Sequence, residues 1–225
     1  AVSSFFLMNI IFNILKKFNW TDGDNLKLNS SKLTVTSLGI SFLICFSIFT
    51  LYLYFTTDLK NLLPNRFYIF FVSLFLLTVI SFIDDKKEID PKLRLIFQLI
   101  LVYFTLTNLQ LNKIELPLKL SIFLTLTFWV YLINITNFID GSDGHCAMHV
   151  LFFMIGILIM SYIREINLFS NILAIVLIPI LSIFIIFFNK PRAKAYMGDT
   201  GSIFLGFIVG FIILEYVIMQ KAYFV

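Results

Sequence analysis

The sequence predicts an all-α protein that crosses a membrane about eight times. Hydrophobic residues make up 60% of the chain and charged residues only 13%, whereas soluble domains carry roughly 25% charged residues. A membrane-spanning helix needs about 20 predominantly apolar residues, and such runs recur along the whole chain. They cover residues 1–15, 38–57, 66–83, 94–110, 117–136, 146–163, 168–188 and 201–220. Short loops join the runs, so we expect one integral-membrane domain over residues 1–225.

Local signals support the first four of these elements. The first run starts at Ala1 and has no small-residue cleavage site, so we interpret it as a clipped span and not as a signal peptide. The second run contains Cys45, which we expect to pack in the core. The third run ends at Asp84, and Asp90 with Pro91 predicts the N-cap and first turn of the fourth helix.

Polar motifs mark the boundaries of the last four elements. The fifth run ends in NITNFIDGSDG, residues 134–144, whose glycines break the helix before the sixth run begins. The seventh run ends at a basic segment, and the eighth begins next to MGDTGS, residues 197–202. The two tryptophans, Trp20 and Trp129, are interpreted as interfacial or packing residues.

The basic residues are distributed unequally between the two sides of the membrane. One side carries Lys16, Lys17, Lys27, Lys32, Lys86, Lys87, Lys92, Arg94, Lys190, Arg192 and Lys194. The other side carries Lys60, Arg66, Lys113, Lys119, Arg164 and Lys221. Because Lys and Arg are enriched in cytoplasmic loops, the first side is predicted to face the cytoplasm. The chain has no soluble basic domain, so its pI near 9.0 does not indicate nucleic-acid binding.

The first acidic cluster, Asp84 and Asp85, ends the third run. Neighbouring carboxylates repel one another, so one pKa should rise unless a cation shares the site. Magnesium is the predicted cation, because it binds carboxylate oxygens together with substrate phosphates. The alternative is a solvated loop in which Lys86 and Lys87 balance the charge.

The second cluster places Asn134, Asn137, Asp140 and Asp143 at intervals of three residues. A step of three falls about 60° short of a full helical turn, so Asn134 and Asn137 can share one polar flank where the fifth span ends. Polar side chains in such a position are costly without partners. The alternative is a helix-capping turn, which needs only one Asn or Asp.

The third cluster surrounds Asp199 at the start of the eighth run, with Gly198, Gly201 and Ser202 beside it. Free backbone N–H groups at a helix N-terminus bind anions, and an Asp there can hold a metal ion that bridges phosphates. The preceding Lys190, Arg192 and Lys194 would attract a phosphorylated substrate. The alternative is an ordinary helix cap beside cytoplasmic basic residues.

The three clusters in this order resemble one enzyme family. DD, N-x-x-N-x-x-D-G-x-D-G and G-D-x-G-S are similar to the motifs of the polyprenyl-phosphate N-acetylhexosamine-1-phosphate transferases, glycosyltransferase family 4. The resemblance runs from about Ile80 to Gly210. The K-x-R-x-x-x-Q pattern at Lys92, Arg94 and Gln98 is closer to the undecaprenyl-phosphate GlcNAc-1-phosphate transferases than to the lipid I branch.

The resemblance implies a reaction and its setting. An N-acetylhexosamine 1-phosphate passes from a UDP-amino sugar to undecaprenyl phosphate, UMP leaves, and a cell-surface polysaccharide such as O-antigen is begun. Mg²⁺ is the implied cofactor, with Mn²⁺ as an alternative. The implied location is the bacterial inner (plasma) membrane, with the active site on cytoplasmic loops. Homodimer formation stays open, as do the amino sugar and the polymer.

The resemblance also implies roles for individual residues. Asp199 corresponds to the metal ligand, with Asp84 and Asp85 beside it, one of which deprotonates or positions the lipid phosphate. Asn137 and Asp140 correspond to the diphosphate and catalytic-network positions. The implied substrate-binding residues are Asn134, Gly141, Asp143, Gly144, Lys92, Arg94 and Lys194.

The chain also departs from the family pattern. Family members usually carry D-x-P-x-x-R-x-x-H and P-x-G-G after the first span, whereas residues 22–39 read DGDNLKLNSSKLTVTSLG. His145 stands where Leu usually follows D-G-x-D-G. A His-containing cytoplasmic loop usually follows the G-D-x-G-S span. We therefore expect a fragment at one or both ends, whose activity without that loop is an open question.

Other function classes are weighed against this one. A membrane prenyltransferase also uses paired aspartates, but needs a second D-x-x-x-D-type cluster. A CDP-alcohol phosphotransferase needs an A-R after its D-G dipeptides and a later G-x-x-x-D-x-x-x-D. A non-catalytic homologue or a transporter is a further alternative, although acids at one membrane face argue against a translocation path. His145 and His149 could mimic a zinc pair, but phosphate chemistry favours magnesium.

Overall fold

The computed structural model describes most of the 225-residue chain. The described residues are 2–22, 34–56, 67–107, 109, 117–141, 144–164, 169–189 and 193–223. Asp143, most of the 22–39 segment and the basic residues Lys190 and Arg192 lie outside them.

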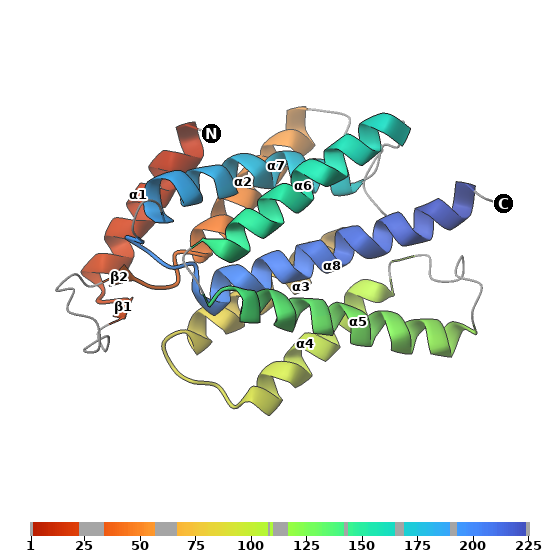
Figure 1. Ribbon diagram of the computed structural model, residues 1–225. Coiled ribbons are helices and arrows are strands. Elements are labelled where there is room, and N and C mark those ends of the chain that lie inside the picture. The colour runs from red at the N-terminus through yellow and green to blue at the C-terminus, as the bar shows by residue number, and fades with distance from the viewer. Residues whose placement is uncertain are drawn as a thin grey trace.

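Helices form at all eight predicted runs, and they assemble into a bundle (Figure 1). They are α1 (Val2–Lys17), α2 (Ile40–Thr56), α3 (Phe67–Asp84), α4 (Pro91–Leu106), α5 (Leu118–Ile139), α6 (His145–Arg164), α7 (Phe169–Ile183) and α8 (Gly198–Tyr223). A π-helix, η3 (Phe184–Asn189), continues α7. The short strands β1 (Thr21–Asp22) and β2 (Thr34–Val35) pair antiparallel. The all-α prediction is confirmed, apart from this small hairpin.

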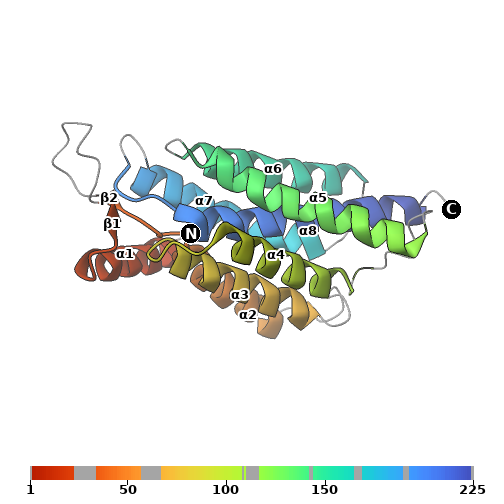
Figure 2. The same ribbon diagram turned by 90° about the horizontal axis from the view of Figure 1, so that it is seen from below.

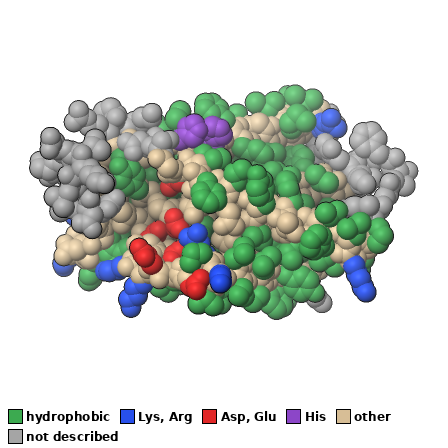
Figure 3. All heavy atoms as spheres, turned by 60° about the horizontal axis from the view of Figure 1, so that its bottom comes forward, with side chains coloured by type: hydrophobic (Ala, Val, Ile, Leu, Met, Phe, Trp, Pro, Cys, Tyr) green, Lys and Arg blue, Asp and Glu red, His purple; other side chains and the backbone are tan. Residues whose placement is uncertain are grey.

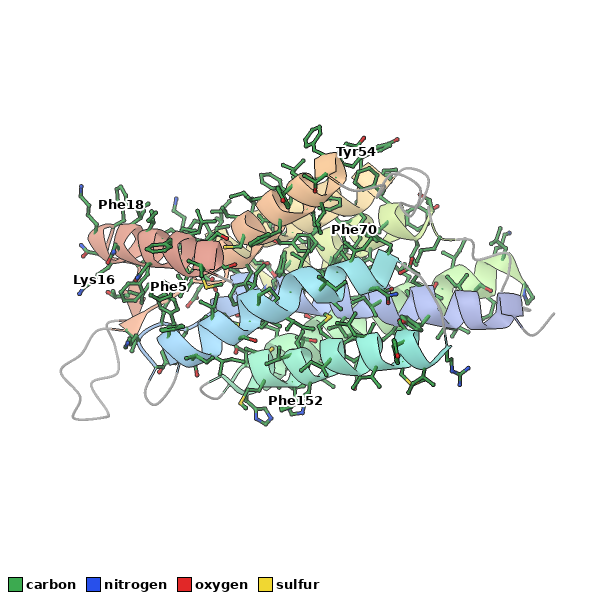
Figure 4. All side chains as sticks on the ribbon, turned by 90° about the horizontal axis from the view of Figure 1, so that it is seen from above. Phe5, Lys16, Phe18, Tyr54, Phe70 and Phe152 are labelled. Carbon is green, nitrogen blue, oxygen red and sulfur yellow. The ribbon has the colours of Figure 1, made fainter. Side chains whose placement is uncertain are left out.

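Five helical segments in the described residues are long and apolar enough to cross a membrane: α3, α5, α6, α7 with η3, and α8 up to Ile218. The helices α1, α2 and α4 have only 16 or 17 residues. Apolar side chains cover both the outside and the inside of the bundle. Phe152 is 64% exposed and points away from it, whereas Phe70 is 3% exposed and points into it (Figure 4).

The helix α8 lies inside the bundle and packs against α5 and α3 (Figures 1 and 2). In its membrane-spanning window 78% of the residues are buried, the largest share among the five spans. Close contact with α5 depends on Gly210, because a Cβ atom there would lie 2.2 Å from Cδ1 of Trp129. Trp129 is fully buried, and its Nε1 donates a hydrogen bond to the Phe207 carbonyl at 2.9 Å. The packing role predicted for Trp129 is confirmed.

Two further local predictions are confirmed. The Asp90 side chain accepts a hydrogen bond from the Lys92 N–H at 2.8 Å, and Pro91 occupies the first turn of α4. Cys45 is fully buried and both cysteines are free. Asp90 therefore satisfies a backbone N–H group in the first turn of α4, and this capping role accounts for it without a catalytic one.

The β-hairpin lies at the end of the bundle away from the C-terminus (Figure 2). It is joined to the segment that leads into α8, because the Val35 N–H donates to the Lys194 carbonyl at 3.2 Å and the Tyr196 N–H donates to the Val35 carbonyl at 2.8 Å. At the same end α3 and α5 finish and α4, α6 and α8 begin. The chain reversals between successive helices therefore bring the three polar motifs together.

Candidate active site

Acidic side chains from three separate motifs meet at this end of the bundle. Asp84 and Asp85 come from the end of α3, Asp140 follows α5, and Asp199 lies in the first turn of α8. Figure 3 shows acidic side chains gathered with basic ones toward one end of a face that is otherwise largely hydrophobic. The convergence predicted from the sequence is therefore present in the fold.

Arg94 joins two of the motifs directly. Its Nη1 atom lies 2.8 Å from an Asp84 oxygen and 2.6 Å from an Asp199 oxygen. The Asp84 side chain is 8% exposed and that of Asp199 is 34% exposed. Charge-assisted hydrogen bonds of this kind are about twice as strong as neutral ones. Removing Arg94 would leave one nearly buried and one half-buried carboxylate without their cation, which is more costly than losing an exposed pair.

The carboxylate of Asp85 occupies the N-terminus of α8. It accepts hydrogen bonds from the Asp199 N–H at 2.8 Å and from the N–H and hydroxyl of Thr200. The helix begins at Gly198, three residues earlier than the predicted apolar run. The N–H groups of Asp199 and Thr200, which the sequence predicted to bind a substrate anion, are bonded to Asp85 instead. Gly198 has a φ of +69°, and a Cβ there would lie 2.6 Å from an Asp85 oxygen.

Electrostatic crowding changes the proton affinity of two of these acids. Burial raises the pKa of Asp140 to about 7, and the charges of Asp199 and Asp85 add to this effect. Burial also raises the pKa of Asp85, while the hydrogen bond from Thr200 opposes that shift. Burial is thus the main cause of both raised pKa values, and the acid whose charge adds to the shift at Asp85 is Asp199, across the cluster, and not the neighbouring Asp84.

The two asparagines of the second motif point toward different helices. Asn137 accepts a hydrogen bond from the Ser202 hydroxyl of α8 at 2.7 Å. Asn134 donates to Gln98 of α4 at 2.8 Å and to the Val130 carbonyl. The polar end of α5 thus has two partners: Asn137 joins α5 to the first turns of α8, and Asn134 joins it to α4, the helix that carries Arg94.

The remaining predicted substrate-binding residues are arranged around this centre. Gly144 has a φ of +69°, and a Cβ there would lie 2.5 Å from the Oδ1 atom of Asn189. Gly141 has room for a side chain, since its nearest neighbour would be the Phe138 carbonyl at 3.7 Å. Lys92 and Lys194 are exposed at the same end of the bundle. Asp143 lies outside the described residues, so its placement stays a prediction.

Two polar residues of this region were missed by the sequence reasoning. Thr200 belongs to the G-D-T-G-S motif and binds Asp85 through both its N–H and its hydroxyl. Asn189 ends η3 with only 2% of its surface exposed, and its Oδ1 atom has no partner among the described residues. The sequence did contain one sign of Asn189, because it is a polar residue directly after the apolar run 168–188.

The donor set is compatible with magnesium. The part of the chain that the structure describes holds no group of three or more His, Cys, Asp or Glu side chains arranged around a metal position. Mg²⁺, however, usually takes one or two carboxylates and fills its remaining positions with water and substrate phosphates. Burial is the main cause of the raised pKa of Asp140, and the nearby charges of Asp199 and Asp85 add to it; a divalent cation held by these carboxylates would offset that added repulsion.

Comparison with known proteins agrees with the motif assignment. Residues 67–217 match the sequence profile described as "Glycosyl transferase family 4". A probable undecaprenyl-phosphate N-acetylglucosaminyl 1-phosphate transferase of Bacillus subtilis (strain 168) is 28% identical over 152 residues, which are 64% of this chain and 42% of that protein. A phospho-N-acetylmuramoyl-pentapeptide-transferase of Petrotoga mobilis is 29% identical over 200 residues, which are 81% of this chain and 61% of that protein.

A further phospho-N-acetylmuramoyl-pentapeptide-transferase, from Leuconostoc citreum, is 34% identical over 148 residues, or 58% of this chain and 43% of that protein. The chain therefore spans between about two fifths and three fifths of the length of these relatives. The profile match begins at Phe67 and so includes every acidic residue of the site described above.

Proposed function

Since the chain belongs to glycosyl transferase family 4, we propose that it is part of an enzyme that transfers a sugar 1-phosphate from a UDP-amino sugar to undecaprenyl phosphate. The transferred group is an N-acetylhexosamine 1-phosphate, the product begins a cell-surface polysaccharide, and UMP is released. The observation that carries the proposal is the meeting of Asp85, Asp140 and Asp199 from three distant motifs around one polar centre.

The proposed chemistry is a displacement at phosphorus. A phosphate oxygen of the lipid attacks the sugar-bearing phosphorus of the donor, a new P–O bond forms, and the bond to the UMP oxygen breaks. Phosphoryl transfer depends mainly on positioning and on neutralising charge. The positions of Arg94 and the exposed Lys92 and Lys194 support a site that attracts and orients phosphates.

Asp199 is the proposed metal ligand, with Asp85 or Asp140 as the second carboxylate. These carboxylates would hold Mg²⁺, which would supply positive charge to stabilise the phosphates during transfer. Asp85 is the less mobile of the two, because it already binds the first turn of α8. Asp140 is the proposed proton acceptor for the lipid phosphate, since no Lys or Arg of the described residues pairs with it. Its pKa of about 7 belongs to the chain without a metal ion, and a cation bound nearby would lower it.

Two sugar-nucleotide donors are candidates, one for each branch of the family. The K-x-R-x-x-x-Q pattern at Lys92, Arg94 and Gln98 favours a UDP-N-acetylhexosamine. The longer match, to the Petrotoga mobilis protein, favours a UDP-N-acetylmuramoyl-pentapeptide as the second candidate. Purified protein in detergent should therefore be given undecaprenyl phosphate, Mg²⁺ and each donor separately, and UMP release should be measured.

The variant that tests the assignment is Asp199→Asn. It keeps the shape of the side chain but removes the charge needed by the metal, so UMP release should fall by at least about a hundredfold. Asp90→Asn is the matched control, because Asn caps a helix as well as Asp does and Asp90 binds only the start of α4 in the structure. Near-normal turnover by Asp199→Asn, or equal loss in both variants, would refute the assignment.

A further inference from the structure

Trp20 is held at a defined position by the way α1 ends. Asn19 adopts a left-handed conformation with a φ of 54°. The Trp20 N–H donates to the Leu15 carbonyl at 3.0 Å, and the Asn19 N–H donates to the Lys16 carbonyl at 3.2 Å. This pair of bonds is the Schellman motif that closes a helix C-terminus. The side chain at position 20 therefore leaves α1 in one direction set by the backbone.

The indole ring of Trp20 packs on the last turn of α3. It stacks on the Phe82 ring with a centroid distance of 4.1 Å and an interplanar angle of 9°. The Nζ atom of Lys86 lies 4.7 Å from the centroid of the indole ring. Offset aromatic stacking and cation–π contact both favour this arrangement beyond simple burial. The two contacted residues flank Asp84 and Asp85 in the sequence, one on either side.

The backbone of Trp20 connects in turn to the start of α8. Its carbonyl accepts a hydrogen bond from the Thr36 N–H at 2.9 Å, next to the β1–β2 pairing. The neighbouring Val35 is bonded on both sides to residues 194 and 196. Two residues later α8 begins with Gly198 and Asp199. The Trp20 side chain thus touches the turn that carries Asp84 and Asp85, and its backbone adjoins the small sheet that is bonded to the segment before Asp199.

We propose that Trp20 is a positioning residue of the phosphotransfer site, which holds the Asp84–Asp85 turn at a fixed distance from Asp199. The inference rests on the proposed function for its kinetic readout, but the contact itself can be tested without it. Direct bonds across the gap come from Arg94 and from the α8 amides, and each of them joins single polar atoms. The stacked rings supply a broad and rigid contact to the same turn.

The physical reason for a kinetic effect is the sensitivity of phosphoryl transfer to geometry. A displacement of about 1 Å at reacting groups can cost on the order of a hundredfold in rate. Trp20→Leu removes both the stacking and the cation–π contact, whereas Trp20→Phe keeps a ring that can stack on Phe82. Phe18→Leu, two residues earlier and 65% exposed in the structure, is the matched control for a change of aromatic side chain at the end of α1.

Two measurements are made on the purified protein in detergent micelles. The first is the kcat and KM for UMP release with undecaprenyl phosphate and UDP-N-acetylglucosamine. The second is hydrogen–deuterium exchange of the peptide that covers residues 82–90. Trp20→Leu should lower kcat about ten- to a hundredfold while KM for the UDP-sugar changes less than about threefold. Exchange in 82–90 should rise, and both Trp20→Phe and Phe18→Leu should behave as the wild type within about threefold.

Each outcome decides the proposal. Unchanged kcat in Trp20→Leu, or a lower kcat without faster exchange in 82–90, overturns the positioning role. If Trp20→Leu does not fold, Phe82→Leu removes the same stack from the partner side and should give the same two changes; wild-type values in that variant overturn it equally. If the wild-type protein transfers no sugar phosphate to any donor, the proposed function fails, and the exchange of 82–90 alone then confirms or rejects the contact.

Discussion

At the scale of single residues, four aspartates of one cluster have four different environments. Asp84 binds Arg94 and the Ile89 N–H, and Asp85 binds the first turn of α8. Asp199 shares Arg94, while the described structure gives Asp140 no hydrogen-bonding cation. Four chemically identical side chains therefore differ in their hydrogen bonds and ion pairs, because each has different neighbours. Asp140, which is partly buried and has no cationic partner among the described residues, has its pKa raised to about 7.

The raised pKa of Asp140 predicts a pH-dependent stability of the metal-free protein. Its value is about 7 in the folded chain against 3.8 for an ordinary Asp. Between these values the folded state binds one proton more than the unfolded state, so stability is fully present below pH 3.8 and is lost as the pH rises through 7. Asp140→Asn should flatten this part of the profile and raise the melting temperature at pH 8.

The measurement is thermal unfolding in detergent with a chelator, at pH 5 and at pH 8. Asp90→Asn changes an exposed cap and leaves Asp140 in place, so its profile should keep the slope of the wild type. A slope in Asp140→Asn as steep as that of the wild type would show that another group causes the pH dependence.

At the scale of secondary structure, α8 connects the site to the interior of the bundle. Its first turn carries Asp199, and its middle is packed against α5 through positions that have no side chain. A Cβ at Gly206 would lie 2.8 Å from the Ile133 Cα. Near the other end the buried Glu215 accepts a hydrogen bond from the Ser170 N–H at 2.8 Å, at the start of α7. Helices that cross a membrane are expected to use such small residues and polar contacts where they touch.

The contact between α8 and α5 predicts opposite effects for two glycine substitutions. Gly210→Ala should lower the melting temperature, since its Cβ would lie 2.2 Å from Trp129 Cδ1 and overpacking costs about 1–3 kcal/mol. Gly156→Ala should be neutral or slightly stabilising. No atom lies within 4 Å of its added Cβ, and Ala is favoured over Gly in a helix by about 1 kcal/mol.

Thermal unfolding of both variants in the same detergent measures the difference. The two substitutions add the same methyl group to helix interiors, so Gly156→Ala controls for helix propensity. Equal melting temperatures would mean that α5 and α8 can move apart to accept the extra carbon.

At the scale of the whole molecule, alternating helix directions place the three motifs at one end of the bundle. The last turn of α3 and the first turn of α5 consequently lie at opposite ends of the bundle. Lys87, which follows α3, and Lys119, in the first turn of α5, are therefore separated by the length of the bundle. The unequal distribution of Lys and Arg predicts that the end with the acids faces the cytoplasm. This orientation also fits the proposed nucleotide-sugar donor, which is a soluble cytoplasmic metabolite class.

Cysteine labelling tests this orientation. A membrane-impermeant maleimide applied to intact cells should label Lys119→Cys, and should label Lys87→Cys only after the membrane is opened. The native Cys45 and Cys146 are 0% and 1% exposed, so the wild-type protein should stay unlabelled and serves as the control. Labelling of both variants in intact cells would contradict the predicted topology.

Much of the helical architecture could be read from local patterns. The length of an apolar run, a cap such as Asp90 followed by Pro91, and glycines at Gly144 and Gly198 act within a few residues, so the chain itself displays them. The residues of the three polar motifs can likewise be recognised from the sequence, because each motif is a short continuous segment. Hairpin pairing of β1 with β2 was missed, because strands of two residues have no readable periodicity.

Local patterns along the chain predict where the helices lie, which polar residues interrupt the apolar runs, and which family the motifs resemble. The groups that meet are set by the packing of the helices: Arg94 bonds Asp199 across 105 positions of the chain, and Asp85 binds the amides of α8 across 114. The physical reason is one of range. Helix formation and membrane burial depend on neighbours along the chain, whereas hydrogen bonds and pKa values depend on neighbours in space, and the packing of α8 among the other helices sets those neighbours.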